Sequence, residues 1–183
     1  MRNRILGFLV LISIIAIGCK KEKSVDELDI VKPEVFDNLF KVTLDVVVKK
    51  DDDFSLYFKD GSSPDFKEPI WTGVKGSETA QKVIFTIPDE IFPDELRLDF
   101  GMKKDQEDVI LKSVLLEYNG EKRTIAGAEM GTYFRADESK CTFDPVTGTI
   151  KAVVKDGVRQ HPSLYPQENT LKAEISKLGK LGK

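Results

Sequence analysis

The chain has 183 residues and a formal net charge of −3, from 28 basic and 31 acidic residues. This balance argues against a nucleic-acid partner, because such a partner is bound by a concentrated basic surface that the sequence lacks. The length suits one domain with a sizeable core. Since Cys19 and Cys141 are the only cysteines, a scaffold held by several disulfides is also excluded.

The first 18 residues have the three parts of a secretory signal peptide. Arg2 and Arg4 form a positive start, an apolar stretch runs from 5 to 17, and the small residue Gly18 precedes Cys19. Residues 15–19 resemble the lipobox of bacterial lipoprotein precursors, which implies cleavage before Cys19 and lipidation of its sulfur. The alternative is an uncleaved transmembrane helix, but this stretch would span only about 20 Å of a hydrocarbon core of roughly 30 Å.

The lipobox resemblance implies a protein of the bacterial cell envelope that meets the membrane through a lipid anchor. The outer membrane is the expected location, and its periplasmic and surface-exposed faces both stay open. Residues 19–32 are rich in charge and predict a flexible tether. This stretch also resembles the segment that follows the lipobox in surface lipoproteins of the Bacteroidota. The folded domain is expected to occupy residues 33–183.

Apolar and polar side chains alternate along much of this domain, which predicts an all-β sandwich. The first two strands are expected to pair as a hairpin through the turn at 50–53. The expected strands are 41–48, 54–58, 82–87, 96–100 and 108–118, followed by weaker ones at 123–125, 132–134, 141–143 and 149–154.

Two local features refine this prediction. The apolar parity of 108–118 changes between Leu111 and Val114, which predicts a β-bulge near Lys112, because one extra residue returns the later side chains to the core face. In the C-terminal segment, Leu171, Ile175 and Leu178 recur at helical spacing. They predict a short helix that ends near Gly179 and packs on the sandwich.

Several of these strands resemble the galactose-binding-like β-sandwich domains of bacterial envelope proteins. The resemblance lies in the runs 81–88, 96–101 and 111–114 and covers about residues 39–154. It implies a jelly-roll-like sandwich that is suited to recognising a ligand. The matching motifs are structural, and no carbohydrate-contact motif can be transferred residue by residue.

Trp71 is the only tryptophan and is the main candidate for ligand binding. An indole presented at the end of a β-sandwich can stack on a sugar ring, with Tyr57, Tyr133 or Tyr165 as partners. The alternative is that Trp71 closes one end of the core, because a tryptophan buries a large area. Exposure of Trp71 beside a concave surface would favour the ligand site.

The three carboxylates of Asp51, Asp52 and Asp53 could bind a structural calcium ion, since calcium prefers oxygen ligands. The alternative is a solvated turn. No other cofactor is predicted. Cys141 lies in an alternating segment and is expected to be a buried, unreactive thiol.

No catalytic constellation is evident. His161 and Ser163 lie two residues apart on a proline-bounded loop, which does not suit a nucleophile and its base, and a packed loop is expected there. Carboxylates that could form a glycosidase pair are abundant, namely Asp94, Glu95, Asp99, Glu107 and Asp108. The sequence therefore favours a non-catalytic module that binds a ligand, a glycan or an envelope protein. The alternative is a structural or assembly lipoprotein with only protein partners.

Overall fold

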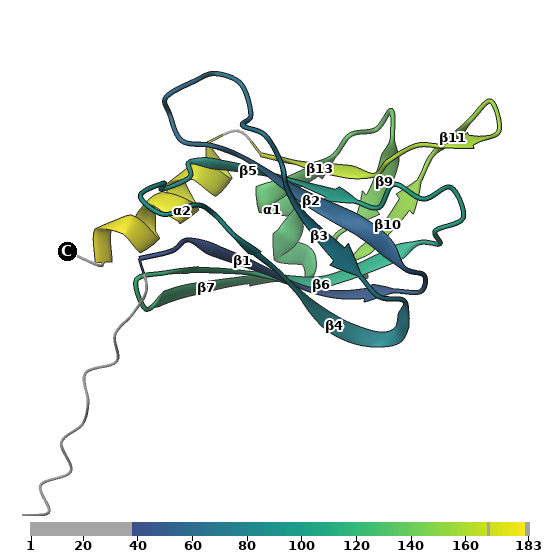
Figure 1. Cartoon of the computed structure of the whole chain (residues 1–183), viewed down its shortest axis with the longest axis horizontal. Helices are drawn as coiled ribbons and strands as arrows, with labels where there is room; N and C mark the ends of the chain where they lie inside the picture. The colour runs from purple at the N-terminus through teal and green to yellow at the C-terminus, as the bar shows by residue number, and fades with distance from the viewer. Residues whose placement is uncertain (1–37, 168, 182–183) are drawn as a thin grey trace, which may run out of the picture. The chain divides into compact units, whose positions relative to one another are not determined.

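The computed structural model describes residues 38–167 and 169–181. The expected signal peptide, Cys19 and the tether lie outside these residues. The described part consists of two antiparallel sheets that face each other, with a C-terminal helix at one end (Figure 1). The predicted all-β sandwich is confirmed.

The first sheet has the spatial order β4 (Ser77–Thr86), β1 (Lys41–Val48), β6 (Val109–Tyr118), β10 (Thr149–Ala152) and β9 (Cys141–Asp144), and β7 (Glu121–Ala126) also pairs with β6. The second sheet has the order β3 (Ile70–Val74), β2 (Asp52–Lys59), β5 (Glu95–Phe100), β13 (Ser163–Pro166) and β8 (Phe134–Ala136). A small separate hairpin is formed by β11 (Val154–Lys155) and β12 (Val158–Arg159). The helical segments are η1 (Gly127–Glu129), α1 (Met130–Tyr133) and α2 (Thr170–Leu181).

The core lies between the sheets and is built from one parity of each strand. On β2 the side chains of Phe54, Leu56 and Phe58 are buried, and on β5 the same is true of Leu96 and Leu98. Burying such a side chain contributes about 1.5–3 kcal/mol. The opposite parity of β2 and β5 therefore forms the outer face of the second sheet, where polar side chains gather.

The prediction that the first two strands form a hairpin is wrong. β1 pairs with β4 and β6 in the first sheet, whereas β2 pairs with β3 and β5 in the second. The turn between them crosses from one sheet to the other. Asp52 stabilises this crossing because its buried carboxylate accepts hydrogen bonds from the backbone N–H groups of Met102 (2.8 Å) and Lys103 (3.2 Å).

The expected bulge is confirmed. Along the β1–β6 ladder, Asp45 pairs with Ser113 and the next residue, Val46, pairs with Leu111, so Lys112 is the extra residue. Leu111 and Val114 are both buried as a result. The bulge reconciles the two apolar parities of this strand with a single core face.

The C-terminal helix α2 contacts β5 of the second sheet and β6 and β7 of the first, so it closes one end of the sandwich (Figure 1). Leu171, Ile175 and Leu178 are buried as expected. Gly179 does not end the helix, which continues to Leu181. Instead, Gly179 permits close packing, because a Cβ atom there would lie 2.9 Å from the ring of Phe92.

Two further segments differ from the prediction. The expected strand at 132–134 is largely helical, because Thr132 and Tyr133 belong to α1 and β8 begins at Phe134. The loop around His161 leads into a strand, β13. Across the described residues, no helix has the length and apolar character needed to cross a membrane.

Candidate ligand pocket on the outer face of the second sheet

The outer face of the second sheet brings polar and aromatic side chains into register. Ser55 of β2 pairs with Trp71 of β3 on one side and with Asp99 of β5 on the other. Tyr57 pairs with Arg97 in the next row of the same face. Because side chains of paired residues project to the same side of a sheet, these five surround one area of the surface.

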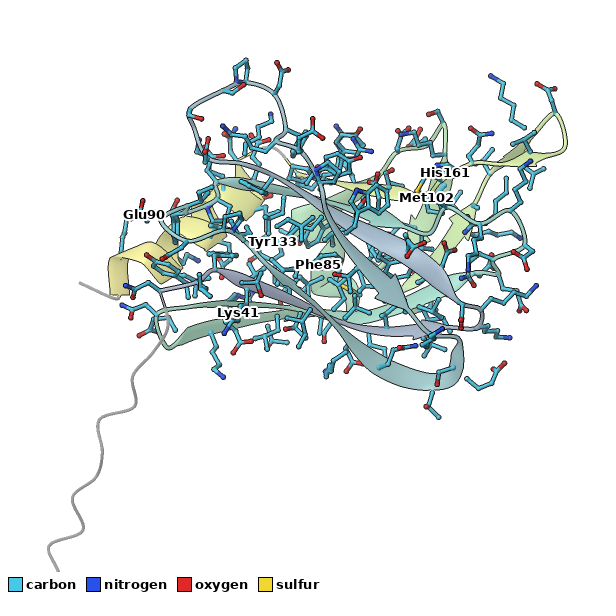
Figure 2. The ribbon with its side chains drawn as sticks, viewed as in Figure 1. Lys41, Phe85, Glu90, Met102, Tyr133 and His161 are labelled. Carbon is cyan, nitrogen blue, oxygen red and sulfur yellow. The ribbon has the colours of Figure 1, made fainter. Side chains whose placement is uncertain are left out.

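This area is the floor of a cavity of about 420 Å³, which we call the outer-face pocket. Its walls come from the segment after β5 and from the β12 region, so the pocket joins parts of the chain that are far apart in sequence. Figure 2 shows Met102 and His161 near each other on this side of the molecule, away from α2. The lining residues are Asp53, Ser55, Tyr57, Trp71, Arg97, Asp99, Gly101, Met102, Lys140, Val158, Arg159, Gln160 and His161. The volume lies in the range of small-molecule sites.

Trp71 is 50% exposed and therefore does not close the core. It lies on β3, at one edge of the second sheet, so nothing pairs with the strand on its far side within that sheet. Met102 and Val158, each 47% exposed, also line the pocket. Exposed large apolar side chains that gather at one cavity are typical of a binding site.

Arg97 and Asp99 form a tightly held pair next to Trp71. The guanidinium donates to Asp99 from Nε (2.8 Å) and from an Nη (2.5 Å). It also lies over the rings of Tyr57 (4.4 Å) and Tyr165 (4.9 Å). Burial lowers the pKa of Arg97, but the hydrogen bonds that it donates to Asp99 and the charge of that carboxylate outweigh burial, and the pKa is raised. Arg97 is thus a rigid, fully engaged part of the floor.

The expected tyrosine partners are only partly brought together. Tyr57 lines the outer-face pocket with Trp71. Tyr165 contacts the same Arg97 but lines a neighbouring cavity of about 410 Å³ that reaches the start of α2. Tyr133 lies elsewhere, on α1, where Arg123 stacks on its ring at 5.6 Å. Of the four aromatic candidates, Trp71 and Tyr57 therefore share the site.

The three consecutive aspartates point to three different environments. Asp51 is exposed and pairs with Lys75 at 2.7 Å, and its pKa is lowered chiefly by a hydrogen bond from the Gly76 N–H. Asp52 is buried at the sheet crossing, and Asp53 lines the outer-face pocket. Within 38–167 and 169–181, no group of three or more His, Cys, Asp or Glu side chains is placed to hold a metal ion. The arrangement favours a turn anchored by Asp52 over a calcium site.

The carboxylates considered for a glycosidase pair are mostly engaged with cations. Asp94 pairs with Lys172, Glu95 with Lys59, Asp99 with Arg97 and Glu107 with Lys49. Among these carboxylates and Asp108, only Asp99 lines the outer-face pocket.

Cys141 and His161, the two other residues with reactive side chains, differ in their exposure to solvent. Cys141 is buried, and burial raises the pKa of its thiol, as expected for an unreactive residue. His161 is exposed at the pocket rather than packed in a loop.

Two buried pocket residues that the sequence did not single out have few polar partners. Ser55 is 1% exposed, and its hydroxyl has no hydrogen-bond partner among the described residues. Arg159 is 9% exposed, donates one hydrogen bond of 3.4 Å to the Lys103 carbonyl, and burial lowers its pKa. The sequence could place Ser55 on the outer face, because it alternates with the core residues of β2 in the same way as Asp53 and Tyr57. The pairing of this strand with β3 and β5 was not readable from the sequence.

Comparisons with family models, with curated proteins and with solved structures find no match for this chain. The chemistry of the pocket therefore rests on its own geometry. An exposed indole can cover the apolar face of a ligand, and Asp53, Asp99 and Gln160 can accept hydrogen bonds from hydroxyl groups. This combination suits a ligand with one apolar face and many hydroxyls.

Proposed function

We propose that this protein is a lipid-anchored lipoprotein of the bacterial cell envelope that binds a glycan in the outer-face pocket and performs no catalysis. The observation that carries the proposal is Trp71, which is half exposed and lines a cavity with Tyr57, Asp53 and Asp99. Sugar rings present one apolar face and a rim of hydroxyls, and this pocket offers a flat aromatic surface beside hydrogen-bond acceptors.

The anchor and the fold class complete this proposal. Lipidation of Cys19 would hold the domain at the membrane, with the outer membrane as the expected location, and the tether would separate the pocket from the bilayer. A jelly-roll relationship to galactose-binding-like domains is consistent with a ligand site on a sandwich. This relationship stays a prediction, as does the lipidation.

The test uses the whole chain, purified in detergent, and the emission of its single tryptophan. In a screen of envelope and dietary polysaccharide fragments, a ligand that stacks on Trp71 should change this emission in a saturable way. Trp71→Ala should weaken binding of that ligand by about 1–3 kcal/mol, measured by calorimetry, because an aromatic anchor is removed. Its melting temperature should change little, because the side chain is half exposed.

Ile84→Ala is the matched control, since Ile84 is also exposed (53%) but does not line the pocket. This variant should bind the glycan as the wild type does. A loss of roughly 3–5 kcal/mol in folding stability for Trp71→Ala, without any glycan bound by the wild type, would instead indicate a structural role for the indole.

The apolar side chains Met102 and Val158 favour a second candidate function. Together with Trp71 they give this part of the surface an exposed apolar character, which is also typical of a site for an envelope protein. The two functions are distinguished by competition. A partner protein captured through Trp71 should be released by a glycan that binds the pocket if the sites coincide, whereas a chain that binds only proteins should show no glycan response.

A further inference from the structure

Arg159 is a buried and weakly compensated positive charge of the outer-face pocket. It is 9% exposed, and among the described residues its side chain donates one hydrogen bond, of 3.4 Å, to the Lys103 carbonyl. No carboxylate of the residues described by the structure lies within ion-pair distance of its guanidinium. A buried guanidinium carries five N–H donors, and buried charges in proteins are normally paired. The geometry therefore makes Arg159 a group that is able to bind an anion at the pocket.

The neighbouring charges do not fill this role. The fields of Asp52 and Asp108 act on Arg159 from beyond ion-pair distance. The Asp52 carboxylate is already engaged by the N–H groups of Asp53, Met102 and Lys103 and by Gln106. Among the other basic pocket residues, Arg97 is held by Asp99, and Lys140 pairs with Asp137 at 3.4 Å. Among the arginines and lysines that line the pocket in the described part of the chain, Arg159 is thus the one whose charge remains available to a ligand.

A second, independent observation also points to a ligand. Ser55 lines the floor between Trp71 and Asp99, and its hydroxyl is buried without a partner. Buried polar groups are nearly always hydrogen-bonded. A ligand oxygen that settles beside Trp71 would supply the missing partner. The floor of the cavity therefore offers a buried hydroxyl, and its wall offers a guanidinium, to a ligand that carries oxygen atoms.

We propose that the sugar held in the outer-face pocket is a carboxylated one, the uronic-acid unit of an acidic polysaccharide, and that its carboxylate binds Arg159. The proposal rests on the glycan-binding function proposed above. The planar fork of a guanidinium matches a carboxylate with two parallel hydrogen bonds. Trp71 covers the sugar ring, and Asp53 and Asp99 accept its hydroxyls. The net charge of −3 means that general attraction of anions does not account for such a preference.

The test titrates the whole chain with oligogalacturonate, oligoglucuronate and alginate fragments, and with the methyl ester of each, while Trp71 emission is recorded. Sulfated galactan fragments and neutral galactan form two further arms. We expect at least one uronate fragment to bind about tenfold or more tightly than its own ester, because the ester keeps the ring and loses the charge. Equal binding of acid and ester, or of neutral galactan, would overturn this inference and leave glycan binding standing.

The remaining results of this titration also test the proposal. Preferential binding of the sulfated fragments would overturn the carboxylate assignment. Absence of binding in every arm, together with a negative outcome of the broader glycan screen, would overturn both the inference and the proposed function. Binding to uronates with the expected ratio supports both.

Substitutions of Arg159 test whether this residue causes the preference for the acid over the ester. Arg159→Gln should reduce the ratio of acid to ester affinity to about one, whereas Arg159→Lys should reduce it partly, since it keeps the charge and loses the fork. Lys155→Gln is the matched control, because it removes one positive charge from the same hairpin at an exposed residue that does not line the pocket. An unchanged ratio in Arg159→Gln would overturn the assignment. If Arg159→Gln does not fold, the ratio in Arg159→Lys decides.

Discussion

Asp52 links the stability of the fold to the shape of the pocket. Its buried carboxylate holds the N–H groups of Met102 and Lys103, and Met102 is part of the pocket lining. Gly101 is required beside it, with φ of 84°, and a Cβ atom at this residue would collide with the Asp52 carboxylate. One charged residue in the turn between the sheets therefore also positions a wall of the candidate site.

Asp52→Ala should lower the free energy of unfolding by about 2–3 kcal/mol, because hydrogen bonds to a buried charged group are lost together. Urea denaturation of the whole chain measures this change. Asp51→Ala is the matched control and should leave the urea midpoint nearly unchanged, since Asp51 is exposed and forms a surface ion pair that solvent screens. Equal effects of the two substitutions would contradict the anchoring role of Asp52.

The sequence could predict some residues of the site and not others. Trp71 was identifiable because a lone tryptophan next to turn residues is unusual, although its exposure depended on the edge position of β3. Arg159 was not identifiable, because its burial comes from contacts between the β11–β12 hairpin and the segment after β5. Such long-range contacts leave no periodic signal in the chain.

At the level of elements, apolar periodicity predicted which strands exist and which side faces the core. Even the bulge at Lys112 followed from a change of parity. Periodicity does not tell which strands are neighbours, and this is why β1 and β2 were expected to pair although they lie in different sheets. The strands β3 and β13 were not predicted because their sequences, IWTGV and SLYP, contain a glycine and a proline and lack a regular alternation of apolar and polar residues.

Deletion of Lys112 tests the bulge. Without the extra residue, Leu111 and Val114 would be two positions apart, so regular pairing with β1 would keep both side chains on the core face. We therefore expect the deletion variant to fold, with only a small change in the melting temperature measured by circular dichroism. A collapse of the fold would contradict the role of Lys112 as the extra residue. Lys112→Ala should leave stability within about 0.5 kcal/mol, because it keeps the register and changes only an exposed side chain.

The attachment of α2 depends on a buried carboxylate. Glu174 accepts hydrogen bonds from Arg123 of β7 and from Lys177, each at 2.5 Å. The hydrogen bond from Lys177 is the largest cause that lowers the pKa of Glu174 below its ordinary value of 4.5, and burial opposes it. A carboxyl with a lowered pKa in the folded state stabilises the protein fully above its ordinary pKa. This contribution is lost as the pH falls through the lower folded value.

Glu174→Gln should therefore lower the free energy of unfolding by about 1–3 kcal/mol at pH 7. The difference from the wild type should become smaller at pH values well below 4.5, where the wild-type carboxyl gains a proton. Urea midpoints of both proteins at pH 7 and at acidic pH measure the difference, and general acid effects cancel in the comparison. A difference that grows on acidification would contradict this role of Glu174.

For the whole molecule, we propose that a lipid anchor at Cys19 holds the domain at the membrane while the sandwich carries the pocket. The buried residues of the described core lie between Phe40 and Leu178. The class of fold was predictable because a core of this size needs two apolar faces. The ligand was not, because sandwiches of one class bind many different partners.

The anchor itself is the last prediction. Cys19→Ala should yield a precursor that is neither acylated nor cleaved before residue 19, since in the proposed lipoprotein the acylated sulfur would be both the anchor and the feature that the processing enzymes recognise. Each buried methylene of an acyl chain contributes about 0.8 kcal/mol, so several chains on Cys19 would hold the wild-type protein firmly in the membrane. Intact-mass analysis of the membrane fraction measures both processing steps. A membrane-bound wild-type protein with an unmodified Cys19 would contradict the lipoprotein assignment, and the pocket would then serve a protein that is held at the envelope by other means.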